Sequence, residues 1–200
     1  MERMKKQNNK IIILVGPSGV GKGSIEKILF TFKELKLKLA CSATTREPRN
    51  GEKDGFHYYF ISKDEFEQKI KNNEFIEWNL HFDNYYGSLF SEIEKIKNEG
   101  FNPILEIETF GALKIFDFFQ KLNRKSELIP IFIKPPSIKE LKKRINERGT
   151  EDKVQIEKRV QKAKDELKQR KYFPYIIKND DLYKAAEEIK NIILGELNEV

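Results

Sequence analysis

Short apolar runs alternate with stretches of helical periodicity along most of the chain. Lys10–Val15 is apolar and rich in β-branched residues, which is typical of a central strand in a parallel sheet. A Gly-rich turn and a helix to about Lys33 follow it. The same reasoning predicts further strands at Leu37–Ser42, Pro103–Glu108, Leu128–Lys134 and Tyr175–Lys178. Helical spacing predicts helices at Ser88–Asn98, Phe110–Leu122, a basic pair around Gly149, and a last one with Leu182, Ala185, Ala186, Ile189, Ile192, Ile193 and Leu197 on one stripe.

The middle of the chain, about 40–94, departs from this alternation. Thr44–Gly55 is a polar loop with several turn signals. Two aromatic segments, Phe56–Ser62 and Glu74–Phe82, read as strands on either side of a short helix near Lys63–Asn73. We therefore expect an α/β fold, with a parallel sheet covered by helices on both faces and a strand-rich insertion.

Composition adds a net charge of +6, and this excess is unevenly placed. Residues 137–171 carry 13 Lys/Arg and 7 Asp/Glu, a difference that equals the excess of the whole chain. Such a segment suits an anionic partner, although a solvated helical surface is the preferred interpretation for most of these lysines. No known nucleic-acid-binding motif accompanies this charge, so nucleic acid is not the expected partner.

The cysteine content and the lengths of the apolar runs indicate where in the cell the protein is expected. The single cysteine, Cys41, cannot form an internal disulfide, which favours a reducing, cytoplasmic location, and it reads as a small buried filler. The apolar run Ile11–Val15 is shorter than a secretory or membrane segment requires, so no membrane association is expected.

A phosphate-binding loop follows the first strand. Its residues match G-x-x-x-x-G-K between a strand and a helix: Gly16, Pro17, Ser18, Gly19, Val20, Gly21, Lys22, Gly23 and Ser24. Glycines let backbone N–H groups converge on a polyphosphate at the helix N-terminus, and Lys22 adds a compact positive charge. Gly23 stands where a metal-binding hydroxyl is common, so Ser24 becomes the alternative hydroxyl for a phosphate or, through water, for a metal. A glycine-rich turn without a ligand is the competing interpretation.

A second anion site is indicated by Arg46 and Arg49, which lie three residues apart in the polar loop. Two guanidinium groups can clamp one phosphate through forked hydrogen bonds. An exposed basic loop without function is the alternative.

Together with further short motifs, these two loops make the chain resemble the guanylate kinase family. The motifs G-P-S-G-V-G-K, T-T-R-x-P-R-x-G-E, D-G-x-x-Y-x-F, F-I-E-W, N-Y-Y-G-S, an acidic strand before a Gly, P-P-S-x-x-x-L-x-x-R, R-G-T-E and N-D-D occur in family order over about residues 11–181. The resemblance implies Mg²⁺-assisted transfer of the γ-phosphate of ATP to GMP, and also to dGMP. It also implies a core of residues 1–39, 95–143 and 166–200, a GMP-binding lobe at 40–94 and a helical lid at 144–165. The sequence leaves monomer and homodimer open.

The resemblance assigns residues to each substrate. The implied GMP-binding set is Ser42, Arg46, Arg49, Tyr58, Glu77, Tyr86, Ser88 and Glu108, with Glu77, Ser88 and Glu108 near guanine. The implied ATP-binding set is the loop Gly16–Ser24 together with Asn179 and Asp180 near adenine. The implied catalytic set is Lys22, Arg46, Arg144, Arg148 and Arg159. Glu106 is implied to lie in the water shell of Mg²⁺.

Some residues keep simpler interpretations or depart from the family pattern. Glu106 and Glu108 replace the aspartates that the family often has, and extended alternation places both on one side of a strand. Trp78 is expected in the core, and His57 and His81 are expected at the surface or in packing. The segment Asp117–Glu127 is longer than is usual in the family pattern and has no assigned function. A binding module without activity, and a kinase for another phosphorylated acceptor, are the rival functions.

Overall fold

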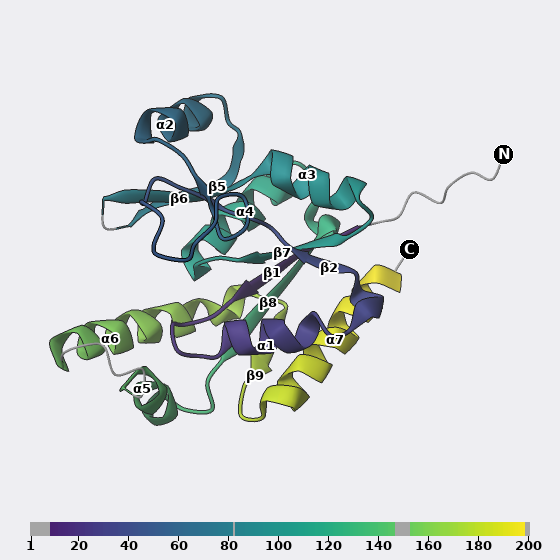
Figure 1. Cartoon of the computed structure of the whole chain (residues 1–200). Helices are drawn as coiled ribbons and strands as arrows, with labels where there is room; N and C mark the ends of the chain where they lie inside the picture. Colours follow the sequence, from purple (N-terminus) through teal and green to yellow (C-terminus); the bar gives the residue numbers. More distant parts are fainter. Residues whose placement is uncertain (1–8, 82, 147–152, 199–200) are drawn as a thin grey trace.

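The computed structural model describes residues 9–81, 83–146 and 153–198 of the 200-residue chain. Its central sheet is parallel and has the strand order β2-β7-β1-β8-β9. These strands are β1 (Ile11–Val15), β2 (Leu37–Leu39), β7 (Asn102–Glu106), β8 (Leu128–Lys134) and β9 (Tyr175–Lys178). The predicted parallel sheet is therefore confirmed, with β1 between β7 and β8 (Figure 1).

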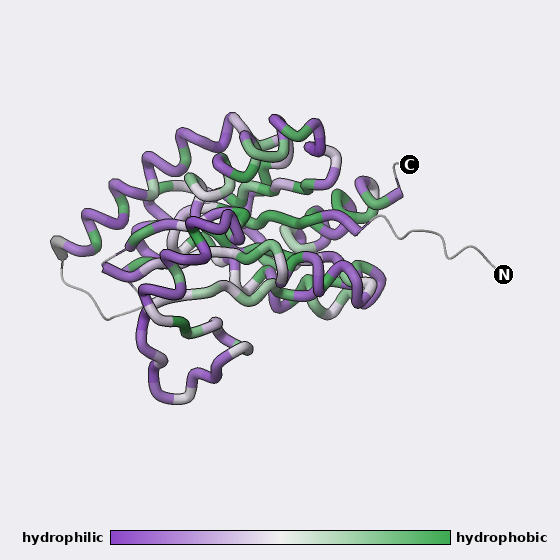
Figure 2. The backbone as a smooth tube through the Cα atoms, turned by 90° about the horizontal axis from the view of Figure 1, so that it is seen from above, coloured by the Kyte–Doolittle hydropathy of each residue, from purple (hydrophilic) through white to green (hydrophobic). Residues whose placement is uncertain are grey.

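Alternation along β1 distributes its side chains to two cores. Ile12 and Leu14 belong to a cluster that packs against α1 (Lys22–Leu29), α5 (Ile138–Asn146), α6 (Lys153–Gln169) and α7 (Leu182–Asn198). Ile11, Ile13 and Val15 join a second cluster with α3 (Phe90–Asn98) and α4 (Thr109–Lys121). Figure 2 shows the apolar strands enclosed by helices whose outer positions are polar. Because both faces of the sheet are covered, its strands are almost wholly apolar.

The insertion forms a smaller sheet with the order β4-β3-β6-β5. Its strands are β3 (Ala43–Thr44), β4 (Tyr59–Phe60), β5 (Phe75–His81) and β6 (Asn84–Leu89), and α2 (Lys63–Lys71) covers it. Its core is small: the ring of Phe66 stacks on Phe75 at 4.2 Å and on Tyr85 at 5.1 Å between centroids. Short 3₁₀ turns at Lys33–Leu35, Lys125–Glu127 and Arg170–Tyr172 complete the described elements.

Several predicted boundaries were wrong. Strand β6 was missed, so Ser88 lies in a strand and not at the start of a helix; its polar Y-Y-G-S pattern becomes a strand through pairing with β3 and β5. The expected strand Phe56–Ser62 shrinks to Tyr59–Phe60 because the chain turns at Gly55, which has a φ of 69°. Strand β7 ends at Glu106, so Glu108 stands at the N-cap of α4. Gly100 follows α3 with a φ of 83°, as expected for a helix terminator.

The prediction for Trp78 was also wrong, since its side chain is 37% exposed. Beyond Ile76, β5 runs out past the central core, and the indole packs at the surface against Tyr85, with the ammonium of Lys114 5.9 Å from its ring. Cys41 is buried and free, and burial raises the pKa of its thiol to about 11, in agreement with a filler role. None of the described helices combines the length and the hydropathy that a membrane crossing requires.

Candidate active site

The loop between β1 and α1 is shaped by close contacts at three of its glycines. A Cβ at Gly16 would lie 2.3 Å from the carbonyl oxygen of Ile133 in β8, and one at Gly21 would lie 2.6 Å from Nδ2 of Asn179. Gly16, Gly19 and Gly21 also have φ values of 149°, 82° and 100°, which other residues adopt at a cost. The sequence therefore forms this loop because only glycine fits its backbone.

The same loop presents donors to a ligand. Gly21 is the N-cap of α1 and has no side chain to cap the helix, so the first N–H groups remain available to an anion. Lys22 begins the helix, and its ammonium donates to the carbonyl of Gly16 at 2.7 Å.

A cavity of about 390 Å³ lies over the loop, and we call it the P-loop cavity. Its lining is Gly16–Gly23, Tyr58, Glu106, Ile107, Glu108 and, from α6, Arg159, Lys162, Ala163 and Glu166. The α6 residues follow helical spacing and so share one face. Glu166 is buried, which raises the pKa of its carboxyl to about 6, while Lys162 acts in the opposite direction.

A second cavity of about 220 Å³, the sheet cavity, adjoins it. Its lining is Ser42, Tyr58, Glu77, Asn79, His81, Tyr86, Gly87, Glu106, Ile107, Glu108 and Gly111. Tyr58 and the segment Glu106–Glu108 line both cavities, so molecules in the two would meet at this wall.

Glu77 is the most enclosed carboxylate of the sheet cavity. It faces Ser88 across the β5–β6 pair, and the Ser88 hydroxyl donates to its Oε1 at 3.0 Å. Burial raises the pKa of Glu77, while the hydrogen bond from Ser88 lowers it. Gly111 makes room for this carboxylate, because a Cβ there would lie 3.0 Å from Oε2. A buried carboxylate beside a hydroxyl suits a ligand that supplies N–H donors.

The arginines of the polar loop differ from each other. Both Nη atoms of Arg46 donate to the carboxylate of Glu52 at 3.0 Å, and the guanidinium lies 5.6 Å from the ring centroid of Tyr58. This bidentate bond is the main cause that lowers the pKa of Glu52 to about 2, and the hydrogen bond from the Arg49 backbone N–H is the second cause. The side chain of Arg49 is exposed. Neither arginine is part of the lining of the two cavities, although Arg46 reaches their shared Tyr58.

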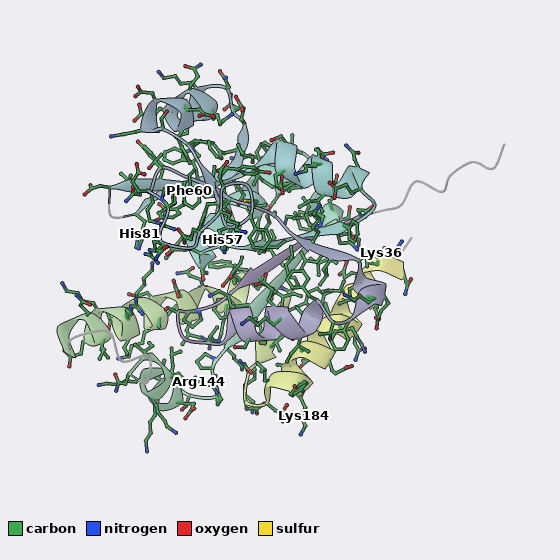
Figure 3. All side chains as sticks on the ribbon, in the orientation of Figure 1. Lys36, His57, Phe60, His81, Arg144 and Lys184 are labelled. Atoms are coloured by element: carbon green, nitrogen blue, oxygen red, sulfur yellow. The ribbon has the colours of Figure 1, made fainter. Side chains whose placement is uncertain are left out.

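Arg144 and Asn179 support the loop from behind. Arg144 donates to the carbonyls of Val20 and Asn179 at 3.4 Å, and the buried Asn179 donates from Nδ2 to the Val20 carbonyl at 2.8 Å. Figure 3 shows Arg144 between α5 and α1 in the lower part of the view, away from His57 and His81 in the upper lobe. Asp180 is exposed and pairs with Lys178 at 2.5 Å. Arg148 lies outside the described residues.

A divalent cation would find carboxylates beside the loop. Glu106 is exposed at the end of β7. Glu26 on α1 is 8% exposed, and its Oε1 has no hydrogen-bond partner. Burial, then the charge of Glu106, raises the pKa of Glu26 to about 7. Among the described residues no three His, Cys, Asp or Glu side chains gather into a metal cage. Mg²⁺, which binds through one or two carboxylates, waters and substrate phosphates, fits this donor set.

Sequence reasoning assigned no site role to eight lining residues: Asn79, His81, Gly87, Ile107, Gly111, Lys162, Ala163 and Glu166. Asn79 and His81 follow Glu77 at alternate positions of β5, so strand periodicity could have found them. Lys162 and Glu166 follow Arg159 at helical spacing. No sequence pattern indicated Gly111, because it lies close to Glu77 only through the packing of two segments that are distant along the chain. His81 was expected at the surface, and it is exposed while also lining the sheet cavity.

This fold and this pair of cavities define a class, the P-loop kinases that act on small phosphorylated substrates. The family model described as guanylate kinase matches residues 8–196, and the chain belongs to the guanylate kinase family.

Curated relatives agree with this assignment. Guanylate kinase of Mycoplasmopsis pulmonis is 56% identical over 97% of each chain, and that of Mycoplasmopsis synoviae is 52% identical over 98% of this chain and 99% of its own. Guanylate kinase of Bacillus cereus is 41% identical over 96% of this chain and 91% of its own. The crystal structure of guanylate kinase from Anaplasma phagocytophilum has a TM-score of 0.73 at 29% identity, covering 96% of this chain and 88% of that chain.

Proposed function

We propose that this chain is an active guanylate kinase that transfers the γ-phosphate of ATP to GMP, and also to dGMP, giving ADP and the nucleoside diphosphate. The observation that carries the proposal is the wall shared by the two cavities at Tyr58 and Glu106–Glu108. It places a backbone-lined anion cradle directly beside a pocket of carboxylates and hydroxyls, as transfer between two nucleotides requires.

In this proposal the P-loop cavity holds the phosphates of ATP. The N–H groups of Gly16–Ser24 surround them and Lys22 exchanges the Gly16 carbonyl for the β- and γ-phosphates. Arg159, which lines the cavity, neutralises the transferred group together with Arg148, and Asn179 and Asp180 lie toward adenine. Arg144 contributes by holding the loop through the Val20 carbonyl.

The sheet cavity holds GMP. Guanine is recognised by Glu77, Ser88 and Glu108. Its N1–H and exocyclic amine donate hydrogen bonds, which a carboxylate accepts. Ser42, Tyr58, Tyr86, Arg46 and Arg49 bind the phosphate of GMP. Glu52 orients the Arg46 fork before the substrate arrives.

Mg²⁺ would be held through water by Glu106, with Ser24 as a further oxygen and Glu26 behind it. When bound, it supplies charge neutralisation for the transferred phosphoryl group. The acceptor phosphate is already largely deprotonated at neutral pH, since its second pKa is about 6, so no general base is needed. The residues of this chain therefore act by positioning and by neutralising charge.

The lone reduced cysteine supports a cytoplasmic location.

The test is a coupled ADP-release assay with GMP, dGMP, AMP and UMP. We expect kcat/KM for GMP to exceed that for AMP by at least about 10³, because AMP would leave the enclosed carboxylate of Glu77 without donors. Glu77→Gln should weaken use of GMP far more than binding of ATP, while Glu94→Gln on the exposed face of α3 serves as the matched control. Equal use of AMP and GMP would refute guanine recognition. Nucleotide binding without turnover would favour the non-enzymatic module.

A further inference from the structure

An ion pair crosses the boundary between the two cavities. Nζ of Lys162 on α6 lies 2.7 Å from Oε1 of Glu108 at the N-cap of α4, although the two residues are 54 positions apart. Both side chains are partly exposed, at 45% and 44%. Lys162 lines the P-loop cavity, and Glu108 lines both cavities. The pair therefore links one substrate site to the other.

The partner of Lys162 is unusual for a helical lysine. Lys168 on the same helix pairs with Asp165 three residues away, as helix surfaces commonly arrange. Lys162 has Glu166 one turn further along the same face, yet it forms an ion pair with Glu108 on another element. Lys162 thus lines the P-loop cavity from the same helix face as Arg159.

We propose that Lys162 is a positioning residue that couples the two sites, an inference that rests on the function proposed above. Without substrate it holds Glu108; when guanine occupies the sheet cavity, Glu108 turns to the donors of the base and Lys162 is released to the phosphates of ATP beside Lys22. An exposed lysine–carboxylate pair is weak, so two N–H donors of guanine replace it readily. The freed ammonium then meets an anion in a cavity it already lines.

The exchange has a thermodynamic consequence. GMP increases the affinity for ATP, and ATP increases the affinity for GMP by the same factor, because coupling between two sites is reciprocal. The coupling is a binding property, so it is measurable without turnover.

The test is calorimetric titration of the full chain with the β,γ-imido analogue of ATP, with and without GMP, and with GMP alone. In wild type we expect GMP to tighten binding of the analogue by about 2- to 5-fold, because the coupling equals the factor by which the exposed pair is favoured. In Lys162→Met this factor should fall to about one, and GMP alone should bind about 2- to 5-fold tighter, since no pair has to be broken. Lys168→Met, which removes an exposed pair from the same helix, should behave as wild type.

Glu108→Gln tests the pair from its other side. It should weaken GMP binding, and in the absence of GMP it should tighten binding of the analogue by about 2- to 5-fold, because Lys162 is then free. Equal coupling in Lys162→Met and wild type would overturn the inference, as would a loss of analogue affinity that is the same with and without GMP. Failure of wild type to bind GMP at all would refute the proposed function itself, and would be recognised before the variants are compared.

Discussion

The two cavities are built from different parts of the chain. The P-loop cavity is built around the glycine-rich loop, which packs closely on the main core, with Gly16 against Ile133 and Gly19 against Ile145. The sheet cavity is lined by side chains that four or more segments bring together, on a lobe whose own buried core is Ala43, Phe66, Phe75 and Leu89. Changes to the glycines of the first cavity should affect folding and function together, whereas changes to the side chains of the second should alter substrate use with less effect on stability.

Lys22→Met should have the largest effect on activity. Lys22 is the charged side chain of the glycine-rich loop, and losing its charge should lower kcat/KM by at least about 10²–10³. The free energy of unfolding should change by less than about 0.5 kcal/mol, because the side chain lies in a cavity and not in the core. Steady-state kinetics and urea unfolding measure both. Lys27→Met on the exposed side of α1 is the control, and unchanged turnover in Lys22→Met would remove the assignment of the loop.

Gly16→Ala should test the backbone cradle directly. The new methyl group would meet the Ile133 carbonyl at 2.3 Å in a backbone region unfavourable to alanine, so the free energy of unfolding should fall by about 2–4 kcal/mol. Gly23→Ala is the matched control within the same loop, since a Cβ there has no atom within 4 Å. Equal stability of the two variants in denaturant titrations would show that the glycines are not needed for packing.

Arg46→Ala should weaken binding of the acceptor nucleotide and leave the stability of the fold unchanged. Loss of a charge-assisted contact should cost about 1.5–3 kcal/mol and appear as a higher KM for GMP, with little change in KM for ATP. Arg49→Ala should act in the same direction but less, because Arg49 is exposed while Arg46 is already oriented by Glu52. If either variant impaired ATP alone, these residues would belong to the other cavity.

Glu166→Gln should produce the smallest change, visible in the pH dependence of stability. The pKa of Glu166 is raised from the usual 4.5 to about 6 in the folded protein, chiefly by burial. The folded state thus binds more protons between these values, and the free energy of unfolding falls as pH rises through this window, by about 1–2 kcal/mol. Glu166→Gln should lack this decline, whereas Glu157→Gln should retain it. Parallel curves for wild type and Glu166→Gln from pH 4 to 7 would contradict the prediction.

The sequence predicted different parts of the site to different extents. Lys22 and its glycines lie in one continuous motif, so spacing alone indicated a phosphate loop. Glu77 and Ser88 were assigned through family resemblance, and their contact depends on strand β6, which local propensity did not predict. Asn179 was expected near adenine, and it proved to brace the Val20 carbonyl, a contact between residues 159 positions apart.

The sequence by itself determined the parallel α/β sheet, the strand-rich insertion and the family, because apolar periodicity and local motifs depend on near neighbours in the chain. Tertiary structure decided which carboxylates meet which cations. The pairing of Lys162 with Glu108, the room that Gly111 leaves for Glu77 and the exposure of Trp78 all depend on how distant elements pack. Such contacts leave no periodic trace, since each is made by two segments whose separation along the chain carries no information about their distance in space.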